Sequence, residues 1–589
     1  MKTKIVLNLK TISSILFFIL SYQLYSQIEY KEVFFEAMKD EMQRNIESLS
    51  YEDFDPPFYI SYTIGDIKVY NAKASLGALY YSLEDVSRNW SARVMVGNYE
   101  INDENFTEHP RYRSNDIEYF NIPLENDYNG IRRSLWISAN NIYKSAASKY
   151  KNKIEAIEKN NLQKSVLEIQ DFCKVPIIKK NIESADFPYS KHHWDSILRV
   201  VSSAFIKYNW IRNSEMELNF YQARIYFMNT EGIKTSVPIQ LASLKIYAQT
   251  LSETGDHISD YIVYHAKTPK DLPTIDKLVE HVDKLANLLN QLKTASKLYE
   301  GYNGPVIISD CISGKFFMKE LFGGKDNLKA FRESLQNKPE SSFSYGKSFN
   351  SFENKMNKKV YPREFTIVTN SKLNSYNKIK LIGDFSIDAE GVEPPEEMVL
   401  VENGVLKALL NDRTPTRNVP NSNGHKRYGI VNNGFSHAVG PGNLFVKSNK
   451  GLSYDSLLIK AINIAKEEDL EYILVAKAPI LHNCQSPVCF YKHYINTGEE
   501  ELIRGIGSQN IITNNLKNVA GVSKEQYIYN ALESFYAYEV VENGSYYNLR
   551  RGIPVSFIVP SNVLIDNIEI DIENKPIYVK LPVVSPPTE

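Results

Sequence analysis

The stretch GDFSIDAEGVEPPEEMVLVENGVLKALLNDRTPT, from Gly383 to Thr416, carries the clearest folding signal in the chain. Its second half is apolar on both sides of Asn403-Gly404, a dipeptide favoured in two-residue hairpin turns because both residues tolerate a positive φ. We therefore expect a β-hairpin over Met398–Leu410. The first half is acidic, and its carboxylates are Asp388, Glu390, Glu393, Glu396 and Glu397. Paired carboxylates can do acid–base work, but so acidic a run before a hairpin is more typical of a solvated turn.

Short segments of β character surround this hairpin. EFTIVTN precedes it, and NLFVKS and YILVAKAP follow it. All three are rich in β-branched and aromatic residues, which favour strands. One predicted helix interrupts them and begins at Ser453, a residue type that accepts N–H hydrogen bonds well at a helix start. The sequence therefore predicts a β-rich domain over residues 301–589.

The preceding residues predict a second domain, 27–300, in which helices and strands are mixed. Apolar residues with helical spacing predict helices over 32–49, 131–160 and 274–305. Segments that alternate or run apolar predict strands over 55–82, 89–101 and 223–252. The expected fold class is α+β, with an α+β N-terminal half and a β-rich C-terminal half.

The bulk composition excludes several classes of protein. A chain of 589 residues is too long for one ordinary core. Hydrophobic residues at 43% and charged residues at 23% are typical of a folded globular protein. Lys and Arg total 68 against 70 Asp and Glu, a net charge of −2. We therefore expect no nucleic-acid or anionic-membrane partner, since both need a clustered positive surface.

The first residues have the pattern of a secretory signal peptide. Three lysines precede a short apolar stretch, Ile12–Leu20, and small and polar residues follow it. We expect cleavage after Ser26, so that residues 1–26 are removed and the mature protein is exported, either periplasmic or secreted. An uncleaved membrane anchor is the alternative, but the apolar stretch is shorter than the roughly 20 residues of a spanning helix. No later segment predicts a membrane span.

The chain has four cysteines, and two of them lie close together in HNCQSPVCFYKH. In an exported protein such a pair, Cys484 and Cys489, is first a candidate disulfide. The alternative is a zinc site that adds His482 and His493. Cys173 and Cys311 are expected to be buried thiols.

A second stretch, GPVIISDCISGKFFMKELFGG from Gly304 to Gly324, has the layout of a small active site. A short apolar strand leads through a polar turn into a predicted helix that ends at a double glycine. Such a turn is a common place for chemistry, because the free N–H groups of a helix start favour anions. The helix, however, contains no histidine.

Several segments, taken in order, resemble the TldD/PmbA family of metallopeptidase-related proteins, which process peptides. They are YISYTIGD, WSARVMVGNYEINDENF and IRRSLWISANNIYKSA in the first half, and YNGPVII, the opening stretch, NSNGHKRYG and EEELIRGIG in the second. The resemblance implies an α+β N-terminal domain followed by a β-rich C-terminal domain. It also implies dimers, commonly of one catalytic and one non-catalytic subunit.

The catalytic branch of that family carries His-Glu-x-x-x-His on the helix after the Pro-Val strand. There two imidazoles hold Zn²⁺ and a carboxylate takes a proton from metal-bound water. Aligned on Gly314, this chain has Met318 and Gly323 at the histidine positions and Lys319 at the glutamate position. The segment EELIRGIGSQN also lacks the cysteine of the family's Cys-Gly-Lys ligand. The resemblance thus points to the zinc-motif-lacking PmbA/TldE-like branch, and we expect no zinc cofactor and no catalytic residue here.

A candidate binding site remains in the loop SNGHKR. His425, beside Lys426 and Arg427, could bind a peptide carboxylate or act as a general base. Together with Asp388 and Glu390 they form the candidate substrate-binding set. The alternative is a loop held by the side-chain hydrogen bonds of its asparagines, Asn421 and Asn423.

These inferences predict an exported, non-catalytic subunit or peptide-binding partner of a zinc-dependent peptidase. It would form a homodimer or a heterodimer with a TldD-like subunit. One alternative is an active peptidase with unusual ligands from His425, His437 or the Cys484 region. Another is a secreted binding or structural protein that retains only the fold.

Overall fold

The computed structural model describes residues 33–107, 120–159, 168–184, 187–253, 255–298, 300–323, 327–332, 334–336, 351–478, 489–504, 506, 516–533 and 549–570. The predicted signal peptide lies outside these residues. The described part starts with a helix over residues 33–48. Helices and extensive sheets are both present, which confirms the predicted α+β fold class.

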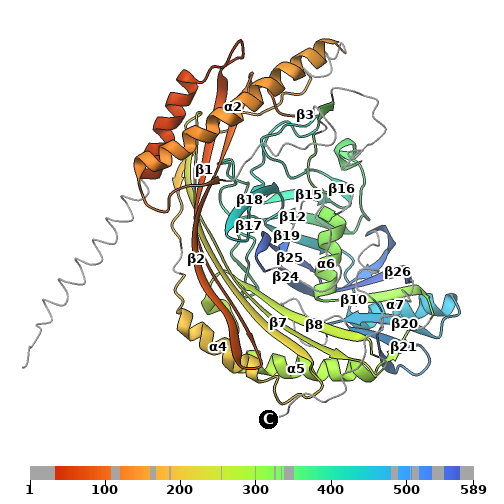
Figure 1. Cartoon of the computed structure of the whole chain (residues 1–589). Coiled ribbons are helices and arrows are strands. Elements are labelled where there is room, and N and C mark those ends of the chain that lie inside the picture. The colour runs from red at the N-terminus through yellow and green to blue at the C-terminus, as the bar shows by residue number, and fades with distance from the viewer. Residues whose placement is uncertain are drawn as a thin grey trace, which may run out of the picture.

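A long curved sheet dominates the N-terminal half (Figure 1). Its strand order is β4-β2-β1-β6-β7-β5, and β8 pairs with β7. The strands are β1 (Pro57–Ser75), β2 (Ala78–Val96), β4 (Phe120–Asn121), β5 (Lys179–Asn181), β6 (Asn213–Asn229), β7 (Lys234–Leu251) and β8 (His257–Ala266). β1, β2, β6 and β7 each exceed the five or six residues of a usual strand, so the sheet spans the whole height of the molecule (Figure 1).

Helices cover the outer, convex face of this sheet at its two ends (Figure 1). At one end lie α2 (Tyr128–Lys159) and the helix over 33–48, and at the other lie α4 (Lys191–Ser203) and α5 (Ile275–Thr294). Each pair buries its own apolar cluster against the strands. Trp90 is fully buried under the first pair, and Leu198 and Leu285 are fully buried under the second.

The end of α5 differs from the sequence prediction. The helix was expected to run to Gly304, but it ends at Thr294, and the next residue is extended with ψ 146°. Ser296 and Lys297 then form β9, which pairs in parallel with β22 (Glu500–Arg504). The helical pattern in the sequence continues past Thr294, so a tertiary strand pairing overrides local propensity here.

The C-terminal half contains two sheets with a helix between them. One sheet has the order β23-β26-β10-β20-β21-β22-β9, and the other β16-β15-β12-β19-β25-β17-β18 with β24 paired to β25. The remaining strands are β10 (Tyr302–Ser309), β12 (Phe365–Thr369), β15 (Met398–Glu402), β16 (Val405–Leu406), β17 (Lys426–Val431), β18 (Gly434–Val439), β19 (Asn443–Ser448), β20 (Tyr472–Lys477), β21 (Cys489–Tyr494), β23 (Val519–Val522), β24 (Gln526–Glu533), β25 (Arg551–Pro560) and β26 (Asn562–Ile570). The helices are α6 (Cys311–Met318) and α7 (Tyr454–Glu467).

Two local predictions are confirmed in this half. β15 and β16 form the expected hairpin, and Asn403 and Gly404 at its turn have φ of 48° and 77°. Ser453 caps α7, and its side chain accepts a hydrogen bond from the N–H of Ser456 at 3.2 Å. Both features depend on residues close together in the sequence.

The C-terminal half lies in the concave face of the N-terminal sheet (Figure 1). An apolar cluster joins them: Ile67 and Ile225 of the sheet pack with Ile387, Ile430 and Phe435 of the C-terminal half. In the described part of the chain, no helix is both long enough and apolar enough to cross a bilayer.

Candidate functional site

The predicted strand–turn–helix is present as β10, a turn at Asp310, and α6. Asp310 has φ 54°, and its N–H donates to Ser561 O at 2.7 Å. One side of α6 packs closely on β24 and β25. A Cβ at Gly314 would lie 2.6 Å from the Cβ of Tyr529, so only glycine fits there. Ser313 Oγ donates to Pro560 O at 2.5 Å. These contacts fix the position of the helix.

The positions that the family resemblance assigns to zinc binding lie at the end of α6 and in the turn that follows it. Met318 and Lys319 are half-buried, and Gly323 is exposed. A thioether is a poor zinc ligand, glycine has no side chain, and an ammonium repels a dication. Within the described residues, no group of three or more His, Cys, Asp or Glu side chains could hold a metal ion. These residues do not fit the zinc ion of the family's catalytic branch.

The backbone at this place is unusual. After α6, residues Lys319–Gly323 form a π-turn, in which hydrogen bonds join residues five apart, and such turns are frequent at functional sites. Glu320 in this turn accepts a hydrogen bond from Leu516 N on its Oε2 at 2.9 Å. Burial raises the pKa of Glu320 to about 7. Sequence analysis did not single out Glu320, because its environment comes from a segment almost 200 residues away.

The acidic loop before the hairpin is only partly solvated, so the interpretation as a solvated turn is wrong for two of its residues. Asp388 and Glu390 are buried, at 1% and 4% exposure, whereas Glu393 and the following glutamates are exposed. Asp388 Oδ1 accepts hydrogen bonds from the N–H of Glu390 at 2.9 Å and of Val392 at 2.8 Å. This side chain therefore folds the loop back on itself.

Glu390 is the centre of a buried charge network. Its Oε1 accepts from Arg93 Nη1 at 2.6 Å and from Lys426 Nζ at 2.9 Å, and its Oε2 accepts from Arg413 N at 2.9 Å. Burial alone would raise the pKa of Glu390, but Lys426, Arg93 and Arg413 outweigh it and hold this pKa well below its usual range. The carboxylate is therefore ionised and fully engaged.

The network extends from Glu390 along Arg413. This fully buried guanidinium makes a two-pronged ion pair with Glu231, at 2.6 and 2.7 Å, and donates to Cys173 O. Its Cζ lies 3.9 Å from the ring centroid of Phe172. Bidentate pairs of this kind fix geometry as well as charge. Arg413 thereby ties the hairpin segment to the N-terminal half.

A second arm runs from Arg93 into the N-terminal half. Arg93 also forms a two-pronged pair with Glu104. Lys153 of α2, only 1% exposed, donates to Glu104 O and pairs with Asp171. Cations and carboxylates alternate along the whole network. Sequence analysis missed Arg93, Glu104 and Arg413, because nothing local distinguishes them from surface residues.

The structure brings together three of the five candidate binding residues. Asp388, Glu390 and Lys426 meet in the network: Asp388 Oδ2 accepts from the N–H of Lys426 at 3.2 Å, and Lys426 Nζ pairs with Asp412 at 3.2 Å. These groups are engaged with one another. His425 and Arg427 flank Lys426 but bond to other partners.

His425 is fully buried, and its Nδ1 lies 2.8 Å from Asn423 O. Burial lowers its pKa to about 4, so the imidazole is neutral near pH 7. Arg427 donates to Pro441 O at 2.6 Å and to Pro554 O at 3.1 Å. Asn423 bonds to Asn411 N and Leu409 O, in line with the alternative of a loop held by asparagine side chains.

Cys489 is buried at the start of β21, whereas Cys484 lies outside the described residues. The predicted disulfide and the alternative metal site therefore stay predictions. Cys173 and Cys311 are buried free thiols, as the sequence analysis expected.

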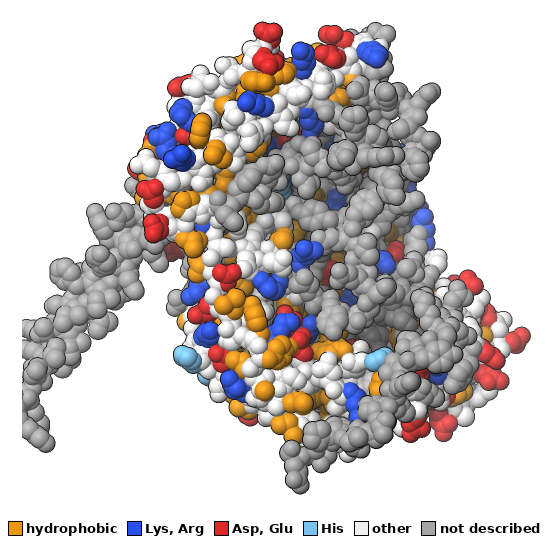
Figure 2. Space-filling model, in the orientation of Figure 1, with side chains coloured by type: hydrophobic (Ala, Val, Ile, Leu, Met, Phe, Trp, Pro, Cys, Tyr) orange, Lys and Arg blue, Asp and Glu red, His pale blue; other side chains and the backbone are white. Residues whose placement is uncertain are grey.

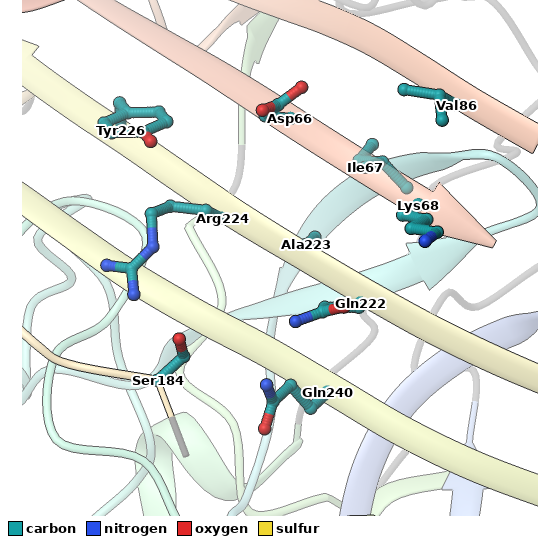
Figure 3. A pocket seen from close by; sticks show the side chains of 10 residues that line it. All are labelled: Asp66, Ile67, Lys68, Val86, Ser184, Gln222, Ala223, Arg224, Tyr226 and Gln240. Carbon is teal, nitrogen blue, oxygen red and sulfur yellow. The ribbon is translucent and has the colours of Figure 1, made fainter. Parts of the chain in front are cut away.

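A hollow of about 410 Å³ lies on the N-terminal sheet (Figure 3). Polar side chains of β1, β6 and β7 line it: Asp66, Lys68, Gln222, Arg224 and Gln240. Arg224 is held by Ile182 O and Ser236 Oγ, both at 2.9 Å. A second hollow, of about 420 Å³, lies between β7 and residues 382–387 of the C-terminal half.

Comparison with known proteins gives the following. Residues 339–571 match the model of the PmbA/TldA metallopeptidase C-terminal domain. No curated protein sequence matches significantly. A crystal structure of TldE from Thermococcus kodakarensis is similar at 12% identity and a TM-score of 0.50, over 91% of this chain and 99% of that one.

Two further crystal structures, both of proposed modulators of DNA gyrase, are also similar with TM-scores of 0.50. The protein from Thermotoga maritima has 13% identity, over 87% of this chain and 96% of that one. The protein from Bacteroides thetaiotaomicron has 12% identity, over 92% and 98%. At these identities the likeness shows the fold, and the C-terminal family match adds the sequence relation. Residues 339–571 therefore place the C-terminal half in the PmbA/TldA metallopeptidase family, and the chain as a whole has the fold of these three structures.

Proposed function

We propose that this chain is an exported, non-catalytic member of its family that serves as a subunit or peptide-binding partner of a zinc-dependent peptidase. The proposal depends on the residues at the end of α6 and in the turn after it. The positions that hold the family's zinc motif contain Met318, Lys319 and Gly323, and none of these supplies an ordinary zinc ligand.

The geometry of the remaining histidines supports the proposal over an active enzyme with unusual ligands. His425 is fully buried and points into the asparagine-held loop. His437 is near Lys426 and Arg93, whose charges would repel a dication. Burial lowers the pKa of His437 to about 3. Among the described residues it belongs to no group of three or more side chains that could hold a metal ion.

The direct test combines metal analysis with a peptidase assay. Purified protein should hold far less than one zinc ion per chain, measured by inductively coupled plasma mass spectrometry. It should cleave an unstructured peptide only when mixed with a relative that carries His-Glu-x-x-x-His. Stoichiometric zinc together with cleavage by the pure protein, abolished by a chelator, would overturn the proposal. Absence of any zinc-bearing partner in co-purification would favour the fold-only alternative.

Export is the second part of the proposal, and it rests on the lysines and the apolar stretch before Ser26. The mature protein should begin at Gln27. Amino-terminal sequencing of protein from the fractionated native cell tests this directly. An intact Met1 in a membrane fraction would favour the uncleaved anchor.

A further inference from the structure

The outer edge of β2 is long and open. β1 pairs with β2 from Ala78 to Val96, but β4 covers only Asn89 and Trp90 on the other side. In the part of the chain that the structure describes, no strand pairs with the outer edge over residues 78–87. Such an edge presents a row of N–H and C=O groups that can accept another strand.

Apolar side chains concentrate on the same segment. Tyr80, Tyr81, Leu83 and Val86 are 56%, 39%, 48% and 51% exposed. Figure 2 shows apolar side chains in orange among charged ones over the lower part of the N-terminal sheet. Edge strands that stay unpaired usually carry lysine, proline or a bulge. Here the bulge lies at Tyr80, and residues 81–87 contain neither lysine nor proline.

The two acidic side chains of this segment are hydrogen-bonded within the same chain, so they do not protect the edge from pairing. Glu84 accepts a hydrogen bond from Tyr189 Oη at 2.8 Å, and Asp85 accepts one from Asn433. Their charges are therefore drawn toward the two faces of the sheet.

Two hydrogen bonds fix which backbone groups point outward. Ile122 N donates to Arg88 O at 3.2 Å, and Lys191 Nζ donates to Ser82 O at 3.3 Å. The outward groups are thus those of the even-numbered residues 82, 84, 86 and 88, and those of Leu83 point toward β1. A second copy of this strand can therefore pair antiparallel with two-fold symmetry only when the axis passes through a residue. An axis that passes between two residues would not bring outward groups together.

We propose that a second copy of this chain pairs antiparallel with this edge, about a two-fold axis at Leu83. In this register Leu83 faces Leu83 of the second copy in a non-hydrogen-bonded pair, where side chains come closest. Ser82 faces Glu84 and Tyr81 faces Asp85, and the regular pairing ends before the bulge at Tyr80. Leucine meets leucine at the axis, and no like charges are directly opposed. The contact is closed and self-complementary, as two-fold dimers require.

The other registers are worse for stated reasons. An axis at Glu84 or Asp85 places two carboxylates opposite each other, which destabilises a pair. An axis at Val86 brings the second copy to Asn89, where β4 already lies. An axis at Ser82 places the bulge at Tyr80 inside the pairing and shortens it. In the proposed register, Lys191 Nζ would release Ser82 O. Ser82 O would then accept a hydrogen bond from the N–H of Glu84 in the second copy.

This inference rests on the subunit role in the proposed function, but it names a different surface. The edge of β2 belongs to the N-terminal sheet, whereas α6 lies between the two sheets of the C-terminal half. A homodimer through β2 would leave the α6 face of each copy unoccupied. Failure of one proposal therefore leaves the other intact.

A cysteine placed on the axis provides the sharpest test. Leu83→Cys should form a disulfide-linked dimer on mild oxidation, seen on a non-reducing gel, because the two Cβ atoms of such a pair lie about 4.5–5.5 Å apart. Val86→Cys, three residues along and equally exposed, should not, because in this register the two copies of residue 86 lie six residues apart along the strands, about 20 Å. Wild-type protein is the background for the native cysteines. A Leu83→Cys chain that stays monomeric, or equal cross-linking of both variants, would overturn the inference.

Light scattering after size exclusion gives an independent readout. Wild-type protein should have twice the chain mass, and Leu83→Lys should have the single-chain mass with an unchanged circular dichroism spectrum. Ile459→Lys, at a side chain 60% exposed on α7, is the matched control and should stay dimeric. The two-fold pairing would be contradicted if wild-type protein were monomeric at tens of micromolar, or if the Leu83→Lys variant were dimeric. The zinc and peptidase assays would be unaffected by either result.

Discussion

Arg93 donates from Nη1 to Oε1 of Glu390 at 2.6 Å, although 297 residues separate them in the sequence. Arg93 belongs to β2 of the curved sheet, and Glu390 belongs to the loop before the β15–β16 hairpin. Both side chains are nearly inaccessible, at 13% and 5% exposure. The two halves of the molecule are therefore joined by a buried ion pair as well as by apolar packing.

Replacing Glu390 by Gln should destabilise the protein strongly. The change keeps the shape of the side chain but leaves Arg93 and Lys426 without their shared counter-charge. Breaking one partner of a buried pair costs about 3–5 kcal/mol. Urea unfolding followed by circular dichroism measures the loss.

Glu393→Gln is the matched control for that experiment. Glu393 lies three residues away in the same loop and pairs with Lys180, but both side chains are well exposed. An exposed pair contributes about 0–1 kcal/mol. Equal losses in the two variants would mean that the Glu390 network adds no more than a surface ion pair.

Gly314→Ala should destabilise the C-terminal half by about 1–3 kcal/mol, because overpacking a rigid core costs this much. The new methyl group would lie 2.6 Å from Tyr529. Gly323→Ala provides the comparison. There the nearest atom is Cγ of Lys319 at 3.0 Å, at the end of a helix and on a flexible side chain. The second variant should change the free energy of unfolding by less than about 1 kcal/mol. A neutral Gly314→Ala would contradict the close packing of α6 on β24.

The sequence predicted features whose causes are local. The Asn403-Gly404 turn and the Ser453 cap each depend on residues within a few positions, and both are present. The burial of Asp388 and Glu390 was not predicted, because it depends on Arg93 and Arg413 arriving from elsewhere in the chain. An acidic run looks the same in the sequence whether water or arginine surrounds it. The early end of α5 has a similar cause, since β22 captures residues 296–297.

The predictions for the candidate site also differ according to whether their causes are local. The predicted strand, turn and helix over Gly304–Gly324 are present as β10, the turn at Asp310 and α6, since a strand, a turn and a glycine are visible in the sequence. The binding role of the set around His425 stays a prediction. Lys426 opens β17 and joins the network, whereas His425 precedes the strand and bonds to Asn423, and nothing in the sequence separates these two neighbours.

Glu320→Gln should alter the pH dependence of stability. Burial raises the pKa of Glu320 to about 7 from an ordinary 4.5. Between these values the folded state binds more protons than the unfolded state, so this group lowers stability as pH rises from 4.5 to 7. Glutamine does not titrate, so the Glu320→Gln variant does not lose stability in this way as pH rises. Relative to wild type it should therefore be more stable at pH 8 than at pH 5, by on the order of 1–2 kcal/mol after allowance for partial exposure. A difference between the two proteins that stays constant from pH 5 to pH 8 would contradict the raised pKa.

The π-turn after α6 allows a gain-of-binding prediction. Residues five apart are joined by a backbone hydrogen bond in such a turn, and Met318 and Gly323 have this spacing. If the backbone of the family site is retained and only its ligands differ, then Met318→His with Lys319→Glu and Gly323→His should restore zinc binding. Two imidazoles on adjacent turns are enough for weak binding, although a structural site uses four ligands. The triple variant should therefore retain several-fold more zinc through a desalting column than wild type, and a chelator should remove it. Met318→His alone is the control, because one imidazole cannot hold the ion. Equal zinc in the triple and single variants would show that α6 does not align with the zinc helix of the catalytic branch.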